Sequence, residues 1–176
     1  MKIRIARPSD EESIRQIHHQ AFEAGERELV SALVGNLLQE QTSPQIIHLV
    51  ADDGDGLVGH VAFSPVFTKE DERLAGWLLA PLAVNPQSQK RGVGKQLVEF
   101  GIKESAQDDT NIILVYGDPD YYARFGFRTA VAENFIPPFE LKYPAGWQGI
   151  DLGNNSPLRT PVSITCVTPL NQPELW

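Results

Sequence analysis

An apolar run, a glycine-containing turn and an amphipathic stretch follow one another in the middle of the chain. Residues 74–84, LAGWLLAPLAV, have the length and composition of a buried strand. The turn QKRGVG, residues 89–94, comes next, and residues 91–107 carry apolar side chains at helical spacing. A strand that leads through a tight turn into a helix predicts a mixed α/β fold, in which helices cover a sheet.

The remaining pattern predicts the same class of fold. Further strands are expected at residues 2–7, twice within 45–66, and at 111–117, 127–131 and 160–170. Further helices are expected at residues 8–22, 26–39 and 118–126. Ser9 and Glu12 have the spacing of a capping box at the first helix. The hairpin within 45–66 and the strand at 74–84 form a meander, so the sheet should be largely antiparallel, in one domain spanning residues 1–176.

Charge and composition exclude several classes of function. The chain has 15 Lys and Arg against 23 Asp and Glu, a net charge of -8, which disfavours nucleic-acid binding and weakly attracts cations. Its apolar runs are too short to span a bilayer, so neither a membrane nor a nucleic acid is expected as a partner. Cys166 is the single cysteine, and we expect a small buried hydrophobe in a cytoplasmic protein.

The turn at residues 89–94 has the features of an anion site. A helix that begins near Gly92 exposes unpaired backbone N–H groups at the positive end of its dipole. Gly92 and Gly94 allow an anion to approach the backbone, Arg91 and Lys95 add positive charge, and Gln89 adds a donor. A phosphate or pyrophosphate would suit this site, although the glycines could equally serve a tight strand-to-helix turn.

Two common phosphate motifs do not match. A Walker loop requires a glycine where Gln89 stands and a serine or threonine where Gln96 stands. A dinucleotide fingerprint requires a third glycine where Leu97 stands. The site is therefore expected to bind another phosphate-bearing ligand.

Two further features lie on either side of this turn. Pro81 removes a ladder hydrogen bond, so the strand at 74–84 should be bulged, kinked or unpaired there. The stretch GDPDYYARFGF follows a buried strand and carries Tyr121 and Tyr122 on a short helix that ends at Gly126.

Together these stretches resemble the acetyl-CoA signature of the GNAT superfamily of N-acetyltransferases, in its bacterial predicted acetyltransferase branch. Residues 89–94 match the family's Q/R-x-x-G-x-G/A, and Tyr122, Gly126 and Phe127 match its tyrosine four residues before a Gly-Phe pair. The resemblance covers roughly residues 46 to 131 and extends weakly to the N-terminus. It implies helices on both faces of a mostly antiparallel sheet that is splayed near Val84, between the fourth and fifth strands.

The resemblance also implies a function. Acetyl-CoA would be the cosubstrate, and the acetyl group would pass to a primary amine of a small molecule or protein. The alternatives are a non-catalytic acyl-CoA-binding regulatory module and an acyltransferase that uses a longer acyl-CoA. A homodimer is the assembly that general frequency favours.

The same resemblance implies roles for particular residues. Tyr122 would protonate the departing thiolate, and a backbone N–H near Leu82 or Ala83 would stabilise the oxyanion. Tyr121 would pack or contact the cofactor. The residues implied in cofactor binding, with Lys95 added for its charge, are Leu82, Ala83, Val84, Gln89, Lys90, Arg91, Gly92, Val93, Gly94 and Lys95.

The general base is left open by the sequence. Many family members use a glutamate on the strand before the turn, but residues 74–84 contain no carboxylate. The candidates are Asp118, which could instead cap the tyrosine helix, His60, which could be a hydrogen-bonded, half-buried strand residue, and Glu26 or Glu28.

The histidines and phenylalanines allow two further expectations. His18, His19, His48 and His60 do not have metal-ligand spacing, so no metal is expected. Phe22, Phe63 and Phe67 could line a substrate channel or, like most aromatic residues on strands, belong to the core.

Overall fold

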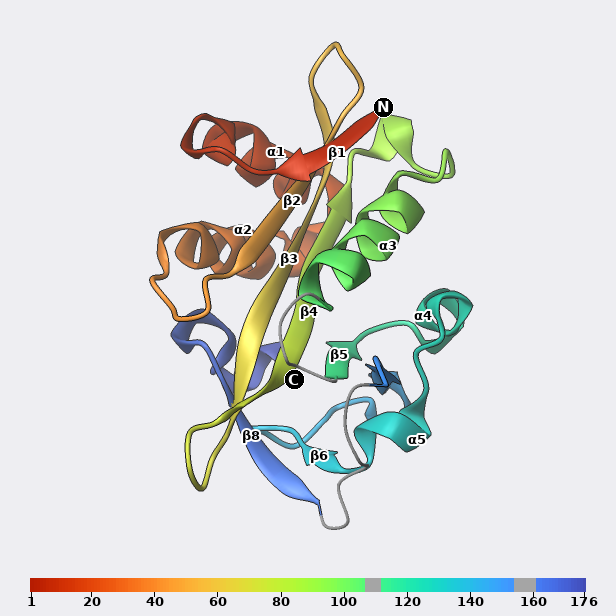
Figure 1. Cartoon of the computed structure of the whole chain (residues 1–176). Coiled ribbons are helices and arrows are strands. Elements are labelled where there is room, and N and C mark those ends of the chain that lie inside the picture. Colours follow the sequence, from red (N-terminus) through yellow and green to blue (C-terminus); the bar gives the residue numbers. More distant parts are fainter. Residues whose placement is uncertain (107–111, 154–160) are drawn as a thin grey trace.

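The computed structural model describes residues 1–106, 112–153 and 161–176 of the chain. Within these ranges eight strands form a mixed, mostly antiparallel sheet with a main path in the order β1-β2-β3-β4-β5-β7, while β8 pairs with β3 and β6 (Figure 1). The strands are β1 (Lys2–Ile5), β2 (Ile47–Asp52), β3 (Leu57–Thr68), β4 (Leu74–Val84), β5 (Ile112–Tyr116), β6 (Phe135–Ile136), β7 (Trp147–Asp151) and β8 (Val162–Cys166). The helices are α1 (Glu11–Ala21), α2 (Ala24–Gln39), α3 (Val93–Ser105), α4 (Pro119–Tyr122) and α5 (Thr129–Ala132). None of the helices in the described ranges has the length and apolar character needed to cross a membrane.

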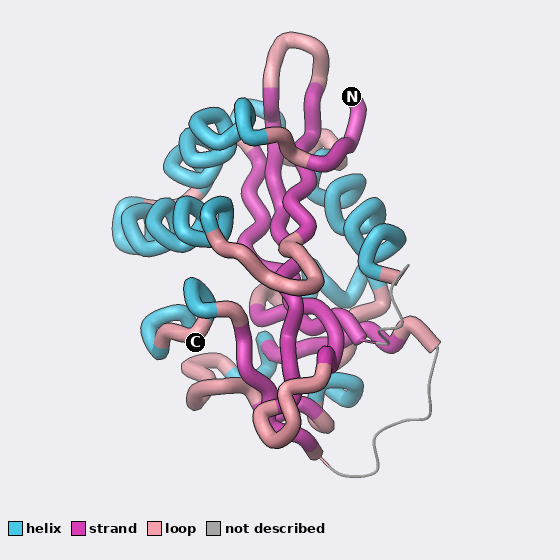
Figure 2. The backbone as a smooth tube through the Cα atoms, turned by 60° about the vertical axis from the view of Figure 1, so that its left-hand side comes forward, coloured by secondary structure: helices cyan, strands magenta, loops and turns pink. Residues whose placement is uncertain are grey.

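Helices cover both faces of the sheet. Figure 1 shows α1 and α2 on one side and α3 on the other, and Figure 2 shows the same division from a second direction. Because side chains alternate along a strand, β4 contributes to both layers. Leu78 packs with Leu33 of α2, whereas Trp77 and Leu79 pack with Leu97 of α3. The expected fold class is confirmed.

The sheet opens along one edge of β4. Parallel pairing of β4 with β5 joins Trp77–Leu79 to Ile113–Val115 and, among the described residues, extends no further. On its other edge β4 continues to pair with β3, but the register shifts between the pairs Val61↔Leu82 and Phe63↔Leu79. Two residues of β4, one of them Pro81, therefore lie opposite a single residue of β3, which is a bulge. The end of β4 diverges from β5 here, so the splay expected between the fourth and fifth strands is present.

The strand expected at residues 127–131 is wrong. Residues 127–131 do not form a strand: Arg128 makes an isolated bridge to Gly149, and α5 follows. The neighbouring edge of β5 is occupied by β7, which the dense Pro and Gly around it concealed from the sequence pattern. The expected ends at residues 107, 111 and 160 lie outside the described residues.

The capping box of Ser9 and Glu12 is also wrong. A 3-10 turn, Pro8–Asp10, precedes α1, and the side chain that serves this turn is Asp10. Its Oδ2 accepts hydrogen bonds from the Arg7 backbone N and from Arg4 Nη1, each at 2.7 Å. The hydrogen-bonded ion pair with Arg4 is partly buried and lowers the pKa of the Asp10 carboxyl.

Candidate active site

A groove of 790 Å³ runs between the end of β4, the turn at residues 89–94 and the short helix α4. Nine of the ten residues predicted to hold the cofactor line it; the exposed Arg91 is not among the lining residues. The others that line it are Ala21, Phe22, Glu99, Tyr121, Arg124 and Phe125. The structure therefore gathers the two sequence motifs around one groove, while the cofactor role of each residue stays a prediction.

The turn places the N-terminus of α3 at this groove. Gly92 is the residue before the helix and has a φ of +80°, in the left-handed region that glycine adopts without strain. The first N–H groups of α3 have no intrahelical partner and lie at the positive end of its dipole. The Gln89 side chain, which was expected to serve the anion, donates from Nε2 to the Val84 carbonyl at 3.2 Å and ties the turn to β4.

Tyr121 lies where this groove meets a second cavity. A Cβ atom at Gly94 would lie 2.5 Å from the Tyr121 hydroxyl, so the absence of a side chain there makes room for the phenol. The Arg124 guanidinium lies 5.0 Å from the Tyr121 ring centroid, within the range of a cation–π contact. Sequence reasoning missed Arg124, although its position three residues after Tyr121 on a helical segment would place it on the same face.

The second cavity, of 490 Å³, shares Phe22, Leu82 and Tyr121 with the groove. Its walls come from α2, β4, the end of β5, α4 and residues 170–176, called the C-terminal segment below. The lining residues are Phe22, Glu26, Val30, Leu33, Leu78, Leu79, Ala80, Pro81, Leu82, Tyr116, Gly117, Asp118, Tyr121, Tyr122, Leu170, Leu175 and Trp176. β8 lies within the strand expected at residues 160–170, but nothing in the local pattern indicated that the segment after it packs against α2, so these lining residues were not identified from the sequence.

Tyr122 lies in the wall of this cavity and is 9% exposed. Its ring packs against the Gly117 backbone, where a Cβ would lie 2.6 Å from Cε2, and edge-on to Phe127. Burial raises the pKa of the Tyr122 phenol above its usual value, and the neighbouring Tyr121 and Asp118 raise it further. The phenol therefore carries its proton at neutral pH.

Two of the candidate bases line the second cavity, and two do not. Glu26 of α2 and Asp118 are lining residues, whereas Glu28 and His60 are not. Asp118 also caps α4, as expected, because its Oδ1 accepts a hydrogen bond from the Asp120 backbone N at 3.0 Å. The structure thus brings two carboxylates to the same cavity as the phenol of the tyrosine motif.

His60 belongs instead to a buried chain of three imidazoles. His18 Nε2 lies 2.9 Å from His60 Nδ1, and His60 Nε2 lies 3.1 Å from His48 Nδ1. His48 Nε2 lies 3.3 Å from the Leu37 carbonyl oxygen, which can only accept. That oxygen requires an Nε2 proton on His48, and the same tautomer follows for His60 and His18 in turn. His18 Nδ1 is then a bare acceptor, and it has no hydrogen-bond partner in the described structure.

Burial keeps these imidazoles neutral. It lowers the pKa of His48 and His60, and lowers that of His18 to about 3. His60 is completely buried, more so than the half-buried strand histidine expected. Within the described ranges, no group of three or more His, Cys, Asp or Glu side chains has the arrangement of a metal site.

The remaining side chains considered from the sequence divide between site and core. Phe22 lines both the groove and the second cavity. Phe63 is fully buried in the α3 layer, and the half-buried Phe67 lines neither cavity. Cys166 is buried, as expected, and its burial raises the thiol pKa to about 12.

Known proteins are similar to this chain in sequence and in architecture. Residues 44–129 match the family model described as an acetyltransferase (GNAT) domain. The Escherichia coli K12 protein named uncharacterized N-acetyltransferase YhbS is 35% identical over 132 residues, covering 74% of this chain and 75% of its own. The crystal structure of Escherichia coli YhbS in complex with CoA matches with a TM-score of 0.82 at 26% identity, over 97% of this chain and 92% of that one. A GNAT acetyltransferase from Brucella melitensis in complex with acetyl-CoA matches with a TM-score of 0.70 at 26% identity, over 96% of this chain and 97% of that one. This chain therefore belongs to the GNAT family of acetyltransferases.

Proposed function

We propose that the protein transfers the acetyl group of acetyl-CoA to a primary amine, with the cofactor in the 790 Å³ groove and the amine in the 490 Å³ cavity. The observation that carries this proposal is the meeting of the two spaces at the splayed end of β4. Leu82 and Tyr121 line both, so a thioester held in one space can reach an amine held in the other. Tyr122 lies in the wall of the second cavity, beside this junction.

The cofactor would bind in three parts. The backbone of Leu82, Ala83 and Val84 pairs with β3 on one edge, and no described strand pairs with the other edge, where the Val84 carbonyl accepts a hydrogen bond from Gln89. The extended pantetheine arm would pair with this open edge. The pyrophosphate would lie at the N–H groups of residues 89–94 and the start of α3. Lys90 and Lys95, which also line the groove, would add positive charge. The complexes of the two similar structures with CoA and acetyl-CoA support CoA as the ligand.

The reaction would proceed by direct attack. The neutral amine nitrogen attacks the thioester carbonyl carbon, and a C–N bond forms while a backbone N–H near Leu82 or Ala83 stabilises the oxyanion. The C–S bond then breaks, and Tyr122 gives its proton to the departing CoA sulfur. Glu26 or Asp118, directly or through water, accepts the proton that the amine loses. The products are an N-acetylated amine and free CoA.

Replacement of the phenol tests this mechanism. We expect Tyr122→Phe to lower kcat by about 10²-fold or more, the usual contribution of a positioned general acid, with little change in the Kd of CoA. Release of free CoA in the presence of an amine measures kcat, and calorimetry measures the Kd. The matched control is Tyr143→Phe, because Tyr143 is 57% exposed and lines neither cavity. An unchanged kcat in Tyr122→Phe would remove this residue from the mechanism.

A second candidate is a non-catalytic acyl-CoA-binding module. The observation that favours it is the absence of any carboxylate from β4, where many family members carry a glutamate. Incubation with acetyl-CoA and a panel of primary amines separates the two functions. Tight cofactor binding without release of CoA for any amine would establish the binding module. Faster release of CoA from a longer acyl-CoA than from acetyl-CoA would establish an acyltransferase that uses the longer donor.

A further inference from the structure

We propose that the acceptor is a small primary amine with an apolar body and no carboxylate, bound in the second cavity between α2 and the C-terminal segment. This inference rests on the proposed function, because it takes the second cavity as the acceptor site. It goes further in naming the chemical class of the substrate and the two walls that select it.

Two segments supply apolar walls to the cavity. Val30 and Leu33 of α2 form one wall, and Leu170, Leu175 and Trp176 of the C-terminal segment form the other. Apolar side chains of β4 and the rings of the tyrosines also line the cavity. Hydrophobic and aromatic walls with a few convergent polar groups are typical of pockets for small ligands. The volume of 490 Å³ falls in the range of about 300–1,000 Å³ that such pockets have.

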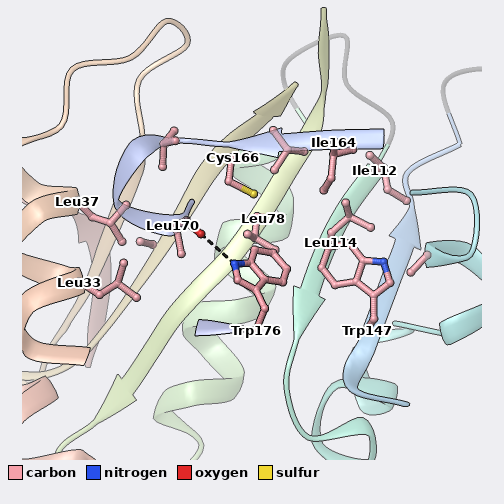
Figure 3. Close-up of a cluster of buried hydrophobic side chains, with 14 residues drawn as sticks. Leu33, Leu37, Leu78, Ile112, Leu114, Trp147, Ile164, Cys166, Leu170 and Trp176 are labelled. Carbon is pink, nitrogen blue, oxygen red and sulfur yellow. Dashed lines mark hydrogen bonds between the residues drawn. The ribbon is translucent and has the colours of Figure 1, made fainter. Parts of the chain in front are cut away.

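The C-terminal wall is held in place by contacts of Trp176. The indole is 3% exposed, and its Nε1 donates to the Leu170 carbonyl at 3.0 Å (Figure 3). Its ring stacks on Tyr116 at 6.0 Å between centroids and meets Trp147 edge-on at 5.7 Å. Figure 2 shows this end of the chain on the same side of the sheet as α1 and α2. The wall is thus in place before any acceptor arrives, which lowers the ordering cost of binding.

The charges of the lining select for a single ammonium group. Glu26 and Asp118 are acidic, and no Lys, Arg or His is among the described residues that line the cavity. One ammonium can be matched by these carboxylates, whereas the additional ammonium groups of a polyamine would have to lose water against apolar walls. A carboxylate on the acceptor would be repelled by both acidic side chains. The apolar body would instead displace water from both walls.

A panel of amines tests the substrate class. We expect kcat/KM for 2-phenylethylamine to exceed that for phenylalanine, which differs by one carboxylate, by about tenfold or more, and to exceed that for ethylamine, which lacks the ring, by a similar factor. Spermidine and a lysine-containing peptide represent the polycationic and the protein acceptors. Higher kcat/KM for spermidine, phenylalanine or the peptide than for 2-phenylethylamine would overturn the inference.

Variants in the two apolar walls test the location. Val30→Asn and Leu175→Asn should each raise the KM for 2-phenylethylamine about tenfold without changing the KM for acetyl-CoA, because both side chains line the second cavity and not the cofactor groove. Ala32→Asn is the matched control, since Ala32 is exposed on the same helix and lines neither space. An unchanged KM in both wall variants would place the acceptor elsewhere.

A charge variant tests the selection of the ammonium. Glu26→Gln should raise the KM for 2-phenylethylamine several-fold, whereas Glu23→Gln should not, because Glu23 is exposed at the start of α2 and outside the lining. Equal effects of the two variants would contradict a specific role for Glu26. Absence of CoA release with every amine would refute the proposed function, whereas transfer to polar amines would refute the acceptor class alone.

Discussion

Gly92 and Gly94 both belong to the turn at residues 89–94, but the structure gives a different reason for each glycine. Gly92 has a φ of +80°, and a Cβ atom there would meet no other atom within 4 Å, so the backbone conformation is what favours glycine. At Gly94 the Tyr121 hydroxyl occupies the space where a side chain would begin. One position is constrained by conformation and the other by a neighbour.

The conformational constraint allows a charge test at Gly92. Asn and Asp both tolerate the left-handed region and have the same shape, so Gly92→Asn and Gly92→Asp should differ mainly by one negative charge. We expect Gly92→Asp to bind CoA at least about tenfold more weakly than Gly92→Asn, because that charge would face the pyrophosphate at the helix N-terminus. Titration calorimetry with CoA provides both values. Equal Kd values would contradict the placement of the pyrophosphate.

Residue positions were predictable from the sequence only where a local motif fixed them. The hexad of residues 89–94 and the spacing of Tyr122 to Gly126 are local, and the structure gathers both stretches around the groove and the second cavity. Glu26 was one of several equivalent acidic candidates, because nothing near it in the chain indicates that α2 faces the end of β4. Contacts between distant segments are invisible to a local pattern.

At the scale of elements, the imidazole chain links α1, β2 and β3. His18 lies on α1, and its ring stacks on Phe22 at 6.1 Å between centroids. His48 and His60 lie on neighbouring strands. The three neutral rings join α1 to the sheet. They lie next to Phe22, which lines both the groove and the second cavity.

The three buried imidazoles should make the free energy of unfolding depend on pH. An unfolded histidine has a pKa of about 6.5. Burial lowers the folded value, to about 3 for His18, so the unfolded state binds more protons below pH 6.5. The stabilisation is complete above pH 6.5 and is lost as the pH falls toward the folded pKa. Each such histidine should lower the free energy of unfolding by up to about 1.4 kcal/mol per pH unit in that range.

Urea unfolding between pH 7.5 and pH 5 measures the effect. We expect His48→Gln to reduce the slope, because it removes one buried titrating group. The control is His19→Gln, since His19 is exposed and should leave the slope unchanged. A free energy of unfolding that stays constant over this range would contradict the assignment of neutral, buried imidazoles.

The predicted helices and strands agree with the structure where the apolar periodicity is strong. The prediction failed where two segments could have paired with the same edge of β5. The strands β3 and β4 and the helices α1, α2 and α3 follow clear apolar patterns. Residues 127–131 have a strand-like composition, but β7 takes the place beside β5, and α5 forms instead. Competition between two segments for one edge depends on tertiary packing, which sequence periodicity does not contain.

At the scale of the whole molecule, hydrophobic clusters lie on both faces of the sheet, and the two largest are on opposite faces. One includes α2 and the C-terminal segment, and the other includes α3 and Tyr122. The general class of fold followed from strand and helix periods. The contribution of Leu170, Leu175 and Trp176 to the second cavity did not, because the segment after β8 reaches α2 through tertiary packing that a local pattern does not contain.

Cofactor binding should stabilise the whole fold. A ligand that binds only the folded state at 100 times its Kd contributes about 2.7 kcal/mol, and a chain of this size shifts its Tm by about 2–4 °C per kcal/mol. We therefore expect CoA at that concentration to raise the Tm by about 5–10 °C. Thermal unfolding followed by circular dichroism measures the shift. Gly92→Asp, tested at the same CoA concentration, should show a much smaller one.

Pro81 has a consequence for the catalytic cycle. Since this residue has no amide proton, the opening beside it is built into the covalent chain and does not depend on an occupant to hold the strands apart. β4 and β5 therefore cannot form an unbroken ladder past this proline. If the cofactor arm binds along this edge, as proposed, we expect it to enter without first breaking hydrogen bonds between the two strands.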